Sequence, residues 1–483
     1  MSIVTEPDLL IYRRTKIVAM VGPASSSQDT IGALIEAGVN VVRINLSHGS
    51  HAAHGAAIAL IRQVAQRLGT PTAILADLCG PKIRTGKFRD GSVELITGST
   101  VTVTSAEVLG DASVIPSQYA ALAQDVVPGN RILLNDGAAE LRVVAVRGHE
   151  VECLVVAGGP VGDHNGINLP GTTVSAPLLM DKDRDDAVFA LAAGVDFIAL
   201  SFVRNGDDSS ALRATVDGVN SAAGIIAKIE KPEALINSED IISRADGIMV
   251  ARGDLGVELN PEQVPLGQSQ LITRARQLSK PVIVATQMLE SMITNARPTR
   301  AEVSDVSFAV ASGADAVMLS GESAVGRFPV AAVQMMDRVA RQTEAYFWHA
   351  GLAFQGAHSP AAVPLPFGDA IAHATARLVT DLRARAVIVI SMHGMTAATL
   401  SAARPAAPVV AISSDQQTCR RMRLMWGVIV HCVASVGAEN LNQIAGRVAR
   451  ELGFAKDGDY VVTVRGFNAD PGISSPSITL LQV

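Results

Sequence analysis

Aromatic residues are scarce in this 483-residue sequence, which contains two Trp, four Tyr and 11 Phe. Proteins that bind single-stranded nucleic acid stack bases on aromatic side chains, and nucleic-acid binders in general carry a basic surface. Here the formal net charge is −6 and the isoelectric point is about 5.9. The composition therefore argues against a nucleic-acid partner, and any affinity for phosphate is expected to be local.

Cysteine is also rare, and its spacing is irregular. Cys79, Cys153, Cys419 and Cys432 include no C-x-x-C pair. The sequence therefore predicts neither a zinc site nor a disulfide framework, and it favours a reducing, cytoplasmic location. Residues 1–20 contain too many charges for a signal peptide. No run of 18 uncharged apolar residues occurs, so no membrane partner is expected.

Hydrophobic residues make up 48% of the chain, against 18% charged residues. A chain of this length is expected to form roughly two to four domains. Short apolar runs alternate with helical stretches up to residue 77 and again after residue 181, as in parallel strands joined by crossovers. The expected strands are residues 16–21, 40–45, 72–77, 196–200, 224–228, 247–250, 281–285 and 314–319. Eight such units close a (β/α)8 TIM barrel, although an open doubly wound sheet has the same spacing.

The alternation stops near residue 80. From there to about residue 177 the sequence has short alternating strands and turns, which predicts a β-rich insertion. Beyond a linker at about 356–367, a second α/β unit begins, with expected strands at 386–391, 409–413 and 460–464. The expected division is a barrel in two parts (1–80 and 178–355), an inserted lid (81–177) and a C-terminal α/β regulatory domain (356–483).

Lys228 and Glu230 stand two residues apart at the end of an expected strand and so project from the same side of it. Burying a charge without a partner costs several kcal/mol, so this pair is not core filler. Asp254 follows the next strand. Glu230 and Asp254 offer hard oxygen ligands for Mg²⁺, while Lys228, Arg43 and Arg84 supply the positive charge that phosphate and carboxylate groups attract.

Together these residues predict phosphoryl transfer, in which the protein and a metal mainly position and neutralise the reacting groups. The sequence has no G-x-x-x-x-G-K-[ST], so a P-loop enzyme is excluded.

Polar residues follow most of the expected strands, and a closed barrel would place them all on one rim. They are Arg43, Asn45, Ser47, Asp77, Ser201, Arg204, Lys228, Glu230, Asp254, Thr286 and Glu322. The polarity of loops explains any one of them, but it does not explain an inward Lys and an inward Glu on one strand. His48, His51 and His54 spread around the start of a helix, so no metal site is expected there.

Longer motifs carry a resemblance to a known family. They are residues 16–26 (KIVAMVGPASS), 43–49 (RINLSHG), 77–86 (DLCGPKIRTG), 168–171 (NLPG), 228–230 (KIE), 247–258 (GIMVARGDLGVE), 285–292 (ATQMLESM) and 318–324 (MLSGESA). With them, the chain resembles the pyruvate kinases from residue 16 into the C-terminal domain. The resemblance implies a barrel with a β lid inserted after the third strand, an allosteric C-terminal domain and a homotetramer.

The resemblance also implies a reaction, in which phosphoenolpyruvate and ADP give pyruvate and ATP. By the matching motifs, Arg43 would hold the phosphate, and Lys228 would stabilise the transferring phosphoryl group and the developing enolate. Glu230 and Asp254 would bind Mg²⁺ or Mn²⁺.

The same motifs imply the remaining substrate contacts. Backbone at Gly253 and Asp254 and the hydroxyl of Thr286 would bind the substrate carboxylate, with Thr286 near the face where the enolate is protonated. Arg84 would reach the nucleotide phosphates as the lid closes, and the residues implied to bind nucleotide are Asn45, His48 and Arg84.

The potassium site of many family members is matched only in part. Asn45, Ser47 and Asp77 match its side chains, but Leu78 replaces a Thr. Lys82 stands where potassium users have a Glu, and its ammonium can replace the monovalent cation. The site is therefore either vestigial or real, and we expect activity without added K⁺.

Residues 391–396 (SMHGMT) fall where the family has a phosphate-binding effector loop, but Met392 and His393 replace donors often found there. The segment is either a site for a sugar phosphate or nucleotide effector, or a structural βα turn.

Two other functions also suit the rim residues: a magnesium-dependent barrel lyase or aldolase, and a non-catalytic metabolite-binding regulator. The lid and Arg84 argue against the first. The retained Lys228 and carboxylates argue against the second.

Overall fold

The computed structural model describes residues 12–349, 365–434, 440–467 and 475–483. Eight parallel strands close a barrel, so the expected TIM barrel is confirmed and the open sheet is excluded. In pairing order the strands are β1 (Lys16–Met20), β16 (Ala316–Leu319), β15 (Val282–Ala285), β14 (Gly247–Ala251), β13 (Gly224–Ile229), β12 (Phe197–Leu200), β3 (Ala73–Asp77) and β2 (Val41–Asn45). Each expected strand overlaps an observed one, with ends that differ by at most two residues.

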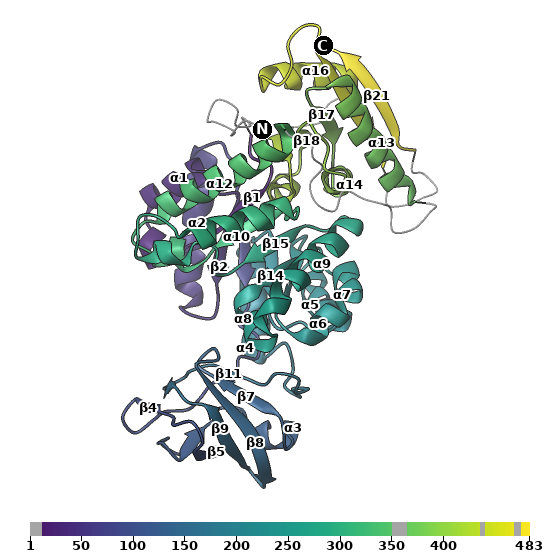
Figure 1. The fold of residues 1–483 in the computed structure, drawn as a ribbon. Helices are drawn as coiled ribbons and strands as arrows, with labels where there is room; N and C mark the ends of the chain where they lie inside the picture. The colour runs from purple at the N-terminus through teal and green to yellow at the C-terminus, as the bar shows by residue number, and fades with distance from the viewer. Residues whose placement is uncertain (1–11, 350–364, 435–439, 468–474) are drawn as a thin grey trace.

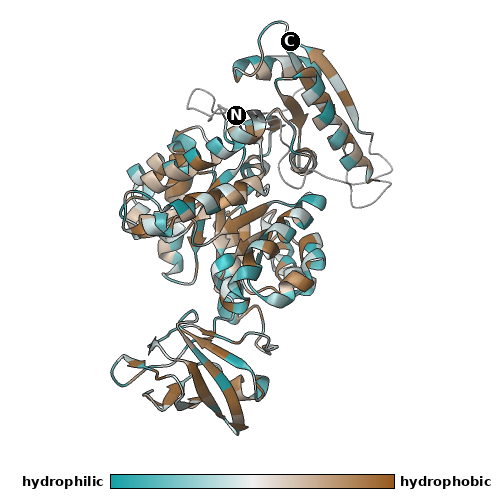
Figure 2. Cartoon of the chain, in the orientation of Figure 1, coloured by the Kyte–Doolittle hydropathy of each residue, from teal (hydrophilic) through white to brown (hydrophobic). Residues whose placement is uncertain are grey.

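Helices surround the barrel because its strands are apolar on both faces and must be covered on the outside. Figure 2 shows hydrophobic barrel strands and helices with hydrophilic outer sides. The helices are α1 (Gln28–Glu36), α2 (His51–Arg67), α4 (Asp181–Ala192), α5 (Gly206–Gly218), α6 (Pro232–Ile236), α7 (Ser238–Arg244), α8 (Arg252–Glu258), α9 (Val264–Gln277), α10 (Arg300–Ala311), α11 (Gly321–Ala324) and α12 (Pro329–His349). Short 3-10 turns η2 (Pro23–Ser25), η3 (Pro261–Gln263) and η4 (Glu290–Ile293) complete this layer.

The β-rich insertion leaves the barrel after β3 and returns before α4. Its larger sheet pairs β11 (Ile167–Asn168), β7 (Arg131–Leu134), β8 (Ala139–Arg147), β9 (Glu150–Ala157), β5 (Thr100–Thr104) and β6 (Val114–Pro116). A smaller sheet pairs β10 (Pro160–Gly162) with β4 (Ser92–Glu94), and the short helix α3 (Leu122–Asp125) follows β6 in the chain. The insertion has a hydrophobic cluster of its own, so it packs as a separate unit.

The C-terminal domain is a five-stranded sheet with helices. Its sheet order is β19 (Val428–Cys432), β18 (Val409–Ser413), β17 (Val387–Ile390), β20 (Tyr460–Arg465) and β21 (Ser477–Gln482). Its helices are α13 (Phe367–Leu382), α14 (Met395–Ala402), α15 (Gln416–Arg421), η5 (Met422–Leu424) and α16 (Leu441–Glu451). β19 and β21 were not expected. Most of the expected linker, residues 356–364, lies outside the described residues.

The lid and the C-terminal domain lie at opposite ends of the molecule (Figure 1). The C-terminal domain packs against the end of the barrel where the strands begin. Arg420 Nε lies 2.8 Å from Asp196 Oδ1, just before β12, and Arg404 Nη1 lies 2.9 Å from Asp315 Oδ1, just before β16. Leu424 of η5 enters the cluster of side chains inside the barrel and is 0% exposed. The C-terminal domain therefore closes the bottom of the barrel.

Leu424→Ala tests this closure. The truncation leaves a cavity among residues that the barrel holds rigidly, and we expect a loss of about 2–5 kcal/mol of unfolding free energy. Urea unfolding followed by circular dichroism measures it. Leu382→Ala on α13, where Leu382 is 38% exposed, is the control and should cost far less. Equal losses would mean that Leu424 does not bear on barrel packing.

The expectation that the chain lacks disulfides is wrong. Cys419 and Cys432 form a disulfide with a Cα–Cα distance of 6.2 Å, a separation that disulfides commonly span. The 13-residue spacing between them gave no signal because the pairing is tertiary: Cys432 ends β19 and pairs with Ser413 of β18, and Cys419 lies on the helix that follows β18. The sequence argument for a reducing compartment relied on the absence of disulfides, so it no longer holds. Cys79 and Cys153 are free.

Within the described residues, no helix is both long and apolar enough to span a lipid bilayer.

Candidate active site

The end of β13 brings Lys228 and Glu230 together, as the strand period predicts. Lys228 Nζ lies 2.9 Å from Glu230 Oε1 and 3.4 Å from Asp77 Oδ1, at the end of β3. It also donates to Ser201 Oγ at 2.8 Å, just after β12. Glu230 is 1% exposed and accepts a hydrogen bond from Phe202 N at 2.7 Å. Three strand ends thus converge on one ammonium group.

The charges of this group are set by burial and by one another. Burial alone would lower the pKa of Lys228, but the Asp77 and Glu230 carboxylates outweigh it and raise that pKa above its ordinary value. Burial would likewise raise the pKa of Asp77, yet Lys228 and Arg43 lower it. At neutral pH, Lys228 is therefore a cation and Asp77 an anion.

Arg43 of β2 faces the same space. Its Nη2 lies 2.6 Å from Asp77 Oδ2, so Asp77 holds both Arg43 and Lys228 in place. Asn45 and Ser47 also lie close together, since Asn45 Oδ1 accepts from Ser47 N at 3.1 Å.

Leu78, the remaining member of the predicted potassium site, differs from the others because its side chain is apolar. Leu78 is 1% exposed and packs in the hydrophobic core, so its side chain supplies no oxygen. In the predicted potassium site, Asn45 and Ser47 thus lie in direct contact, and Leu78 is apolar.

Thr286 lies in a left-handed turn that the sequence pattern did not predict. Its φ is +71°, a left-handed conformation that costs a β-branched residue of order 1–3 kcal/mol. The turn brings Thr286 Oγ1 to 2.7 Å from Gly253 N, which donates to it. Arg252 supports the turn by donating to Thr286 O at 2.7 Å and pairing with Asp305 at 2.6 Å. Sequence reasoning missed Arg252, although it lies within the motif that contains Asp254.

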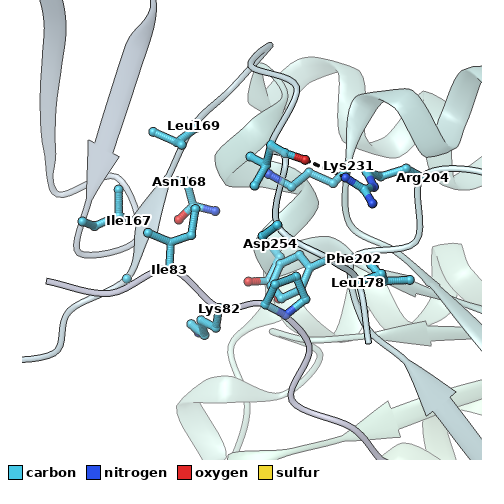
Figure 3. Close-up of a pocket in the computed structure, with 14 residues that line it drawn as sticks. Lys82, Ile83, Ile167, Asn168, Leu169, Leu178, Phe202, Arg204, Lys231 and Asp254 are labelled. Atoms are coloured by element: carbon cyan, nitrogen blue, oxygen red, sulfur yellow. Dashed lines mark hydrogen bonds between the residues drawn. The ribbon is translucent and has the colours of Figure 1, made fainter. Parts of the chain in front are cut away.

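A cavity of about 50 Å³ lies between the lid and the barrel. Figure 3 shows Lys82 and Asn168 from the lid side, and Asp254, Phe202 and Arg204 from the barrel side. Lys82 is exposed, and among the described residues its ammonium makes no ion pair. The structure therefore puts Lys82 on the cavity, without a hydrogen bond or ion pair to the potassium-site residues.

The sequence analysis also missed a contact between the lid and the barrel. Glu258 at the end of α8 is 6% exposed, and its Oε1 lies 2.5 Å from Lys231 Nζ. The same oxygen accepts a hydrogen bond from Asn168 Nδ2 of β11 at 3.2 Å. This contact ties the lid to the barrel beside Asp254. The available signals were that Lys231 follows the 228–230 motif and that Glu258 is the last residue of the 247–258 motif.

Several predicted residues lie apart from this centre. Arg84 stays on the lid, where Nη1 donates to His164 O at 2.9 Å. His48 is exposed, and its carbonyl contacts His54 Nε2 at 2.8 Å. Glu322 is buried and accepts hydrogen bonds from Leu289 N and Ser320 N, so it supports loops and does not reach the cavity.

Glu230 and Asp254 provide the candidate metal ligands. Burial raises the pKa of Glu230; Lys228 opposes this shift, and the neighbouring Asp254 carboxylate adds to it. A divalent cation between the two carboxylates would offset that repulsion, so the donor set fits the group. In the described part of the chain, no group of three or more His, Cys, Asp or Glu side chains is placed to hold a metal ion. A divalent cation held by Glu230 and Asp254 alone would have coordination positions left for water or substrate, as Mg²⁺ usually does.

Comparison with known proteins shows which family the chain belongs to. The family model for the pyruvate kinase barrel domain matches residues 12–333, and the model for the pyruvate kinase alpha/beta domain matches residues 369–474. The chain belongs to the pyruvate kinase family.

Relatives match this family member over nearly its whole length. A pyruvate kinase from Mycobacterium intracellulare is 44% identical over 95% of the chain and 96% of that protein. Pyruvate kinase 2 of Synechocystis is 42% identical over 94% of the chain and 76% of that protein. The crystal structure of a pyruvate kinase from Cryptosporidium parvum superposes with a TM-score of 0.90 at 36% identity, covering 98% of this chain and 97% of that one. Barrel, β-rich domain and C-terminal domain are thus those of the pyruvate kinase family.

Proposed function

We infer that this enzyme transfers the phosphoryl group of phosphoenolpyruvate to ADP, giving pyruvate and ATP. The observation that carries this conclusion is the meeting of Lys228, Glu230 and Asp77 on the rim of a barrel that belongs to the pyruvate kinase family. The lid beside that rim suits a transfer from which water must be excluded, because water competes with ADP for the phosphoryl group.

Lys228 and Arg43 carry the charge chemistry. We propose that Arg43 holds the phosphate of phosphoenolpyruvate, for which its planar fork of donors is suited. Lys228 stabilises the phosphoryl group in transit and the negative charge that develops on the enolate oxygen. Asp77 pairs with both cations, which supports its role of fixing them before the substrate arrives.

Thr286 and Gly253 form the proposed carboxylate site. In this structure Gly253 N donates to Thr286 Oγ1 at 2.7 Å, and Thr286 Oγ1 donates to Ala285 O at 2.6 Å; a bound carboxylate would accept from both donors in place of these two hydrogen bonds. The left-handed turn aims the hydroxyl, and Thr286 would then stand at the face where the enolate takes up its proton. Asp254 follows Gly253 directly, so its backbone amide can join this site.

Glu230 and Asp254 would hold Mg²⁺ or Mn²⁺, which supplies charge neutralisation for the phosphate when bound. Asn45, His48 and Arg84 remain the proposed nucleotide contacts. The Asn168–Glu258 contact supports this arrangement, because it places a lid strand beside Asp254.

A pyruvate-formation assay with ADP, phosphoenolpyruvate and Mg²⁺ tests the function. Pyruvate and ATP should appear in equal amounts, and omission of ADP should stop both. A lyase or aldolase would consume phosphoenolpyruvate without ADP, and a non-catalytic regulator would bind it without turnover. Either result would overturn the assignment.

Potassium independence is a separate prediction. We propose that Lys82 supplies the monovalent positive charge, so activity in buffer free of K⁺ and Na⁺ should equal that with K⁺ added. Lys82→Glu should lose activity in that buffer and recover with K⁺. Wild-type enzyme that is inert until K⁺ is supplied would refute the proposal, whatever the variant does.

The remaining assignments are proposals of the same kind. We propose domain limits of 1–80 and 178–355 for the barrel, 81–177 for the lid and 356–483 for the regulatory domain. A homotetramer, a cytoplasmic location and an effector site at residues 391–396 for a sugar phosphate or nucleotide complete them. Size-exclusion chromatography with light scattering, cell fractionation and an effector screen at low phosphoenolpyruvate test these in turn.

A further inference from the structure

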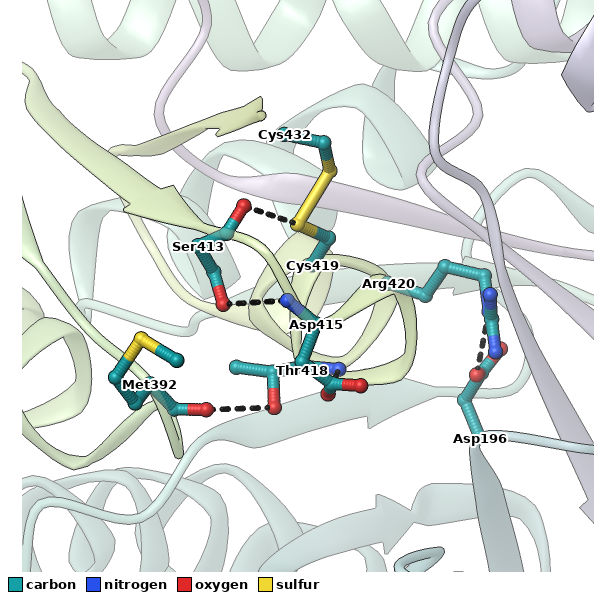
Figure 4. Close-up of a disulfide and its surroundings, with 8 residues drawn as sticks. All are labelled: Asp196, Met392, Ser413, Asp415, Thr418, Cys419, Arg420 and Cys432. Carbon is teal, nitrogen blue, oxygen red and sulfur yellow. Dashed lines mark hydrogen bonds and ion pairs between the residues drawn. A yellow bond between two sulfur atoms is a disulfide. The ribbon is translucent and has the colours of Figure 1, made fainter. Parts of the chain in front are cut away.

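The disulfide of the C-terminal domain encloses the segment that holds this domain on the barrel. Cys419 and Cys432 mark the ends of residues 420–431, here called the bridged segment. Within it, Arg420 pairs with Asp196 of the barrel, and Leu424 packs inside the barrel. Figure 4 shows the disulfide next to the Arg420–Asp196 pair.

The second half of the bridged segment holds the start of β1 and the residue before β16. Gly427 N donates to Arg14 O at 2.9 Å, and Lys16 Nζ donates to Val428 O at 2.7 Å. Trp426 N donates to Asp315 Oδ1 at 3.3 Å. Barrel contacts thus run along the bridged segment from Arg420 to Val428.

The residue next to Cys419 also contacts the loop after β17 of the same domain. Thr418, next to Cys419, donates from Oγ1 to Met392 O at 3.1 Å. Met392 lies in the loop after β17, so the same short helix connects that loop with the barrel contact at Arg420 (Figure 4). Thr418 and Arg420, which make these two contacts, are thus the direct neighbours of Cys419 in α15.

The two sulfurs differ in access. Cys419 is 0% exposed and lies 3.6 Å from Ser413 O, which can accept a hydrogen bond from its thiol once the disulfide is reduced. Cys432, at the end of β19, is only partly buried. An external thiolate can thus attack Cys432 Sγ. When the disulfide breaks, the protonated Cys419 thiol can donate to Ser413 O.

We propose that Cys419 and Cys432 form a reversible thiol–disulfide site that sets how firmly the bridged segment holds the C-terminal domain on the barrel. The disulfide closes a loop and so removes conformations in which the bridged segment has left the barrel. Reduction restores those conformations without removing any barrel contact. The oxidised enzyme is therefore the more tightly coupled state.

The redox step is a thiol–disulfide exchange with a small external dithiol or disulfide. In reduction, a dithiol's thiolate attacks Cys432 Sγ, the protein S–S bond breaks, and Cys419 leaves as a thiolate that takes up a proton. The second thiol of the reagent then displaces Cys432, and the reagent becomes a cyclic disulfide. In oxidation, two cysteine thiols give two electrons and two protons to an external disulfide, which becomes two thiols.

Hydrogen exchange on the full-length enzyme tests the proposal. One sample is treated with oxidised glutathione and the other with dithiothreitol. Thiol counting under denaturing conditions should give two thiols and four thiols, because the chain has four cysteines and two of them pair. The amides of residues 420–428 should exchange about tenfold faster in the reduced sample, since local opening costs less without the loop closure. Lid peptides should not change.

Two variants separate this pair from the other cysteines. Cys432→Ser should show the fast exchange of the reduced enzyme under both treatments. Cys79→Ser should switch like wild type, because Cys79 lies at the base of the lid. Burial raises the pKa of Cys153 to about 12, so that thiol should stay inert.

Two results would overturn the proposal. One is peptide mapping that finds no 419–432 link after oxidation. The other is equal exchange of the bridged segment in the oxidised and reduced wild type. Neither depends on a variant that must fold.

Discussion

Lys228→Met should lower kcat about 10³-fold or more, with a much smaller change in phosphoenolpyruvate binding. The ammonium lies 2.9 Å from Glu230 and 3.4 Å from Asp77, which raise its pKa, so it stays charged throughout the working pH range. A fixed positive charge in a largely buried site acts mainly on charge that develops during reaction, and removal of one such donor typically costs 10²–10³ or more. Methionine is unbranched and only one atom shorter than lysine, so the substitution removes the charge and the hydrogen bond to Ser201 Oγ while keeping most of the apolar stem.

Steady-state kinetics and a binding titration separate the two effects. A loss in kcat with near-normal affinity indicates a role in the transition state, whereas a rise in KM alone indicates uniform binding. Lys456→Met, an exposed lysine of the C-terminal domain, is the matched control and should behave as wild type. A Lys228→Met enzyme that turns over near the normal rate would remove Lys228 from the mechanism.

Glu230→Gln should lower kcat/KM by about 10²-fold or more and raise the Mg²⁺ concentration needed for half-maximal rate. Glutamine preserves the shape and can still accept from Phe202 N, which now donates to Glu230 at 2.7 Å. It removes one of the two carboxylates that fit a divalent cation. It also leaves Lys228 paired with Asp77 alone, so the ammonium is held less firmly.

The Mg²⁺ titration is the decisive readout for Glu230. Glu239→Gln on the exposed side of α7 is the control and should leave the titration unchanged. If Glu230→Gln kept the wild-type Mg²⁺ dependence while losing activity, Glu230 would act only through Lys228. Thermal unfolding of both variants checks that the barrel is intact.

The strands and the rim were accessible from the sequence because both depend on local patterns. Apolar runs of four to six residues separated by helices specify parallel strands, and eight of them close a barrel. The strand period put Lys228 and Glu230 on one side, and the structure places them 2.9 Å apart. Asp77 was assigned to the same rim because it ends the third expected strand of the barrel.

Contacts between distant segments were not accessible. The left-handed turn at Thr286 depends on Arg252, which donates to Thr286 O. The link between Asn168 of the lid and Glu258 of the barrel joins residues 90 positions apart. Neither has a periodicity or a spacing that one sequence can reveal, since each follows from how two elements dock.

The cysteines show this limit most clearly. Irregular spacing predicted no disulfide, yet the register of β18 and β19 brings Cys432 beside Ser413 and the helix that carries Cys419. The sequence by itself determined the family, the eight parallel strands and the pairing of Lys228 with Glu230, because periodicity and contiguous motifs encode them. The tertiary structure alone decided the disulfide, the strained turn and the insertion of Leu424 into the barrel, because each depends on the packing of segments that are separate in the chain.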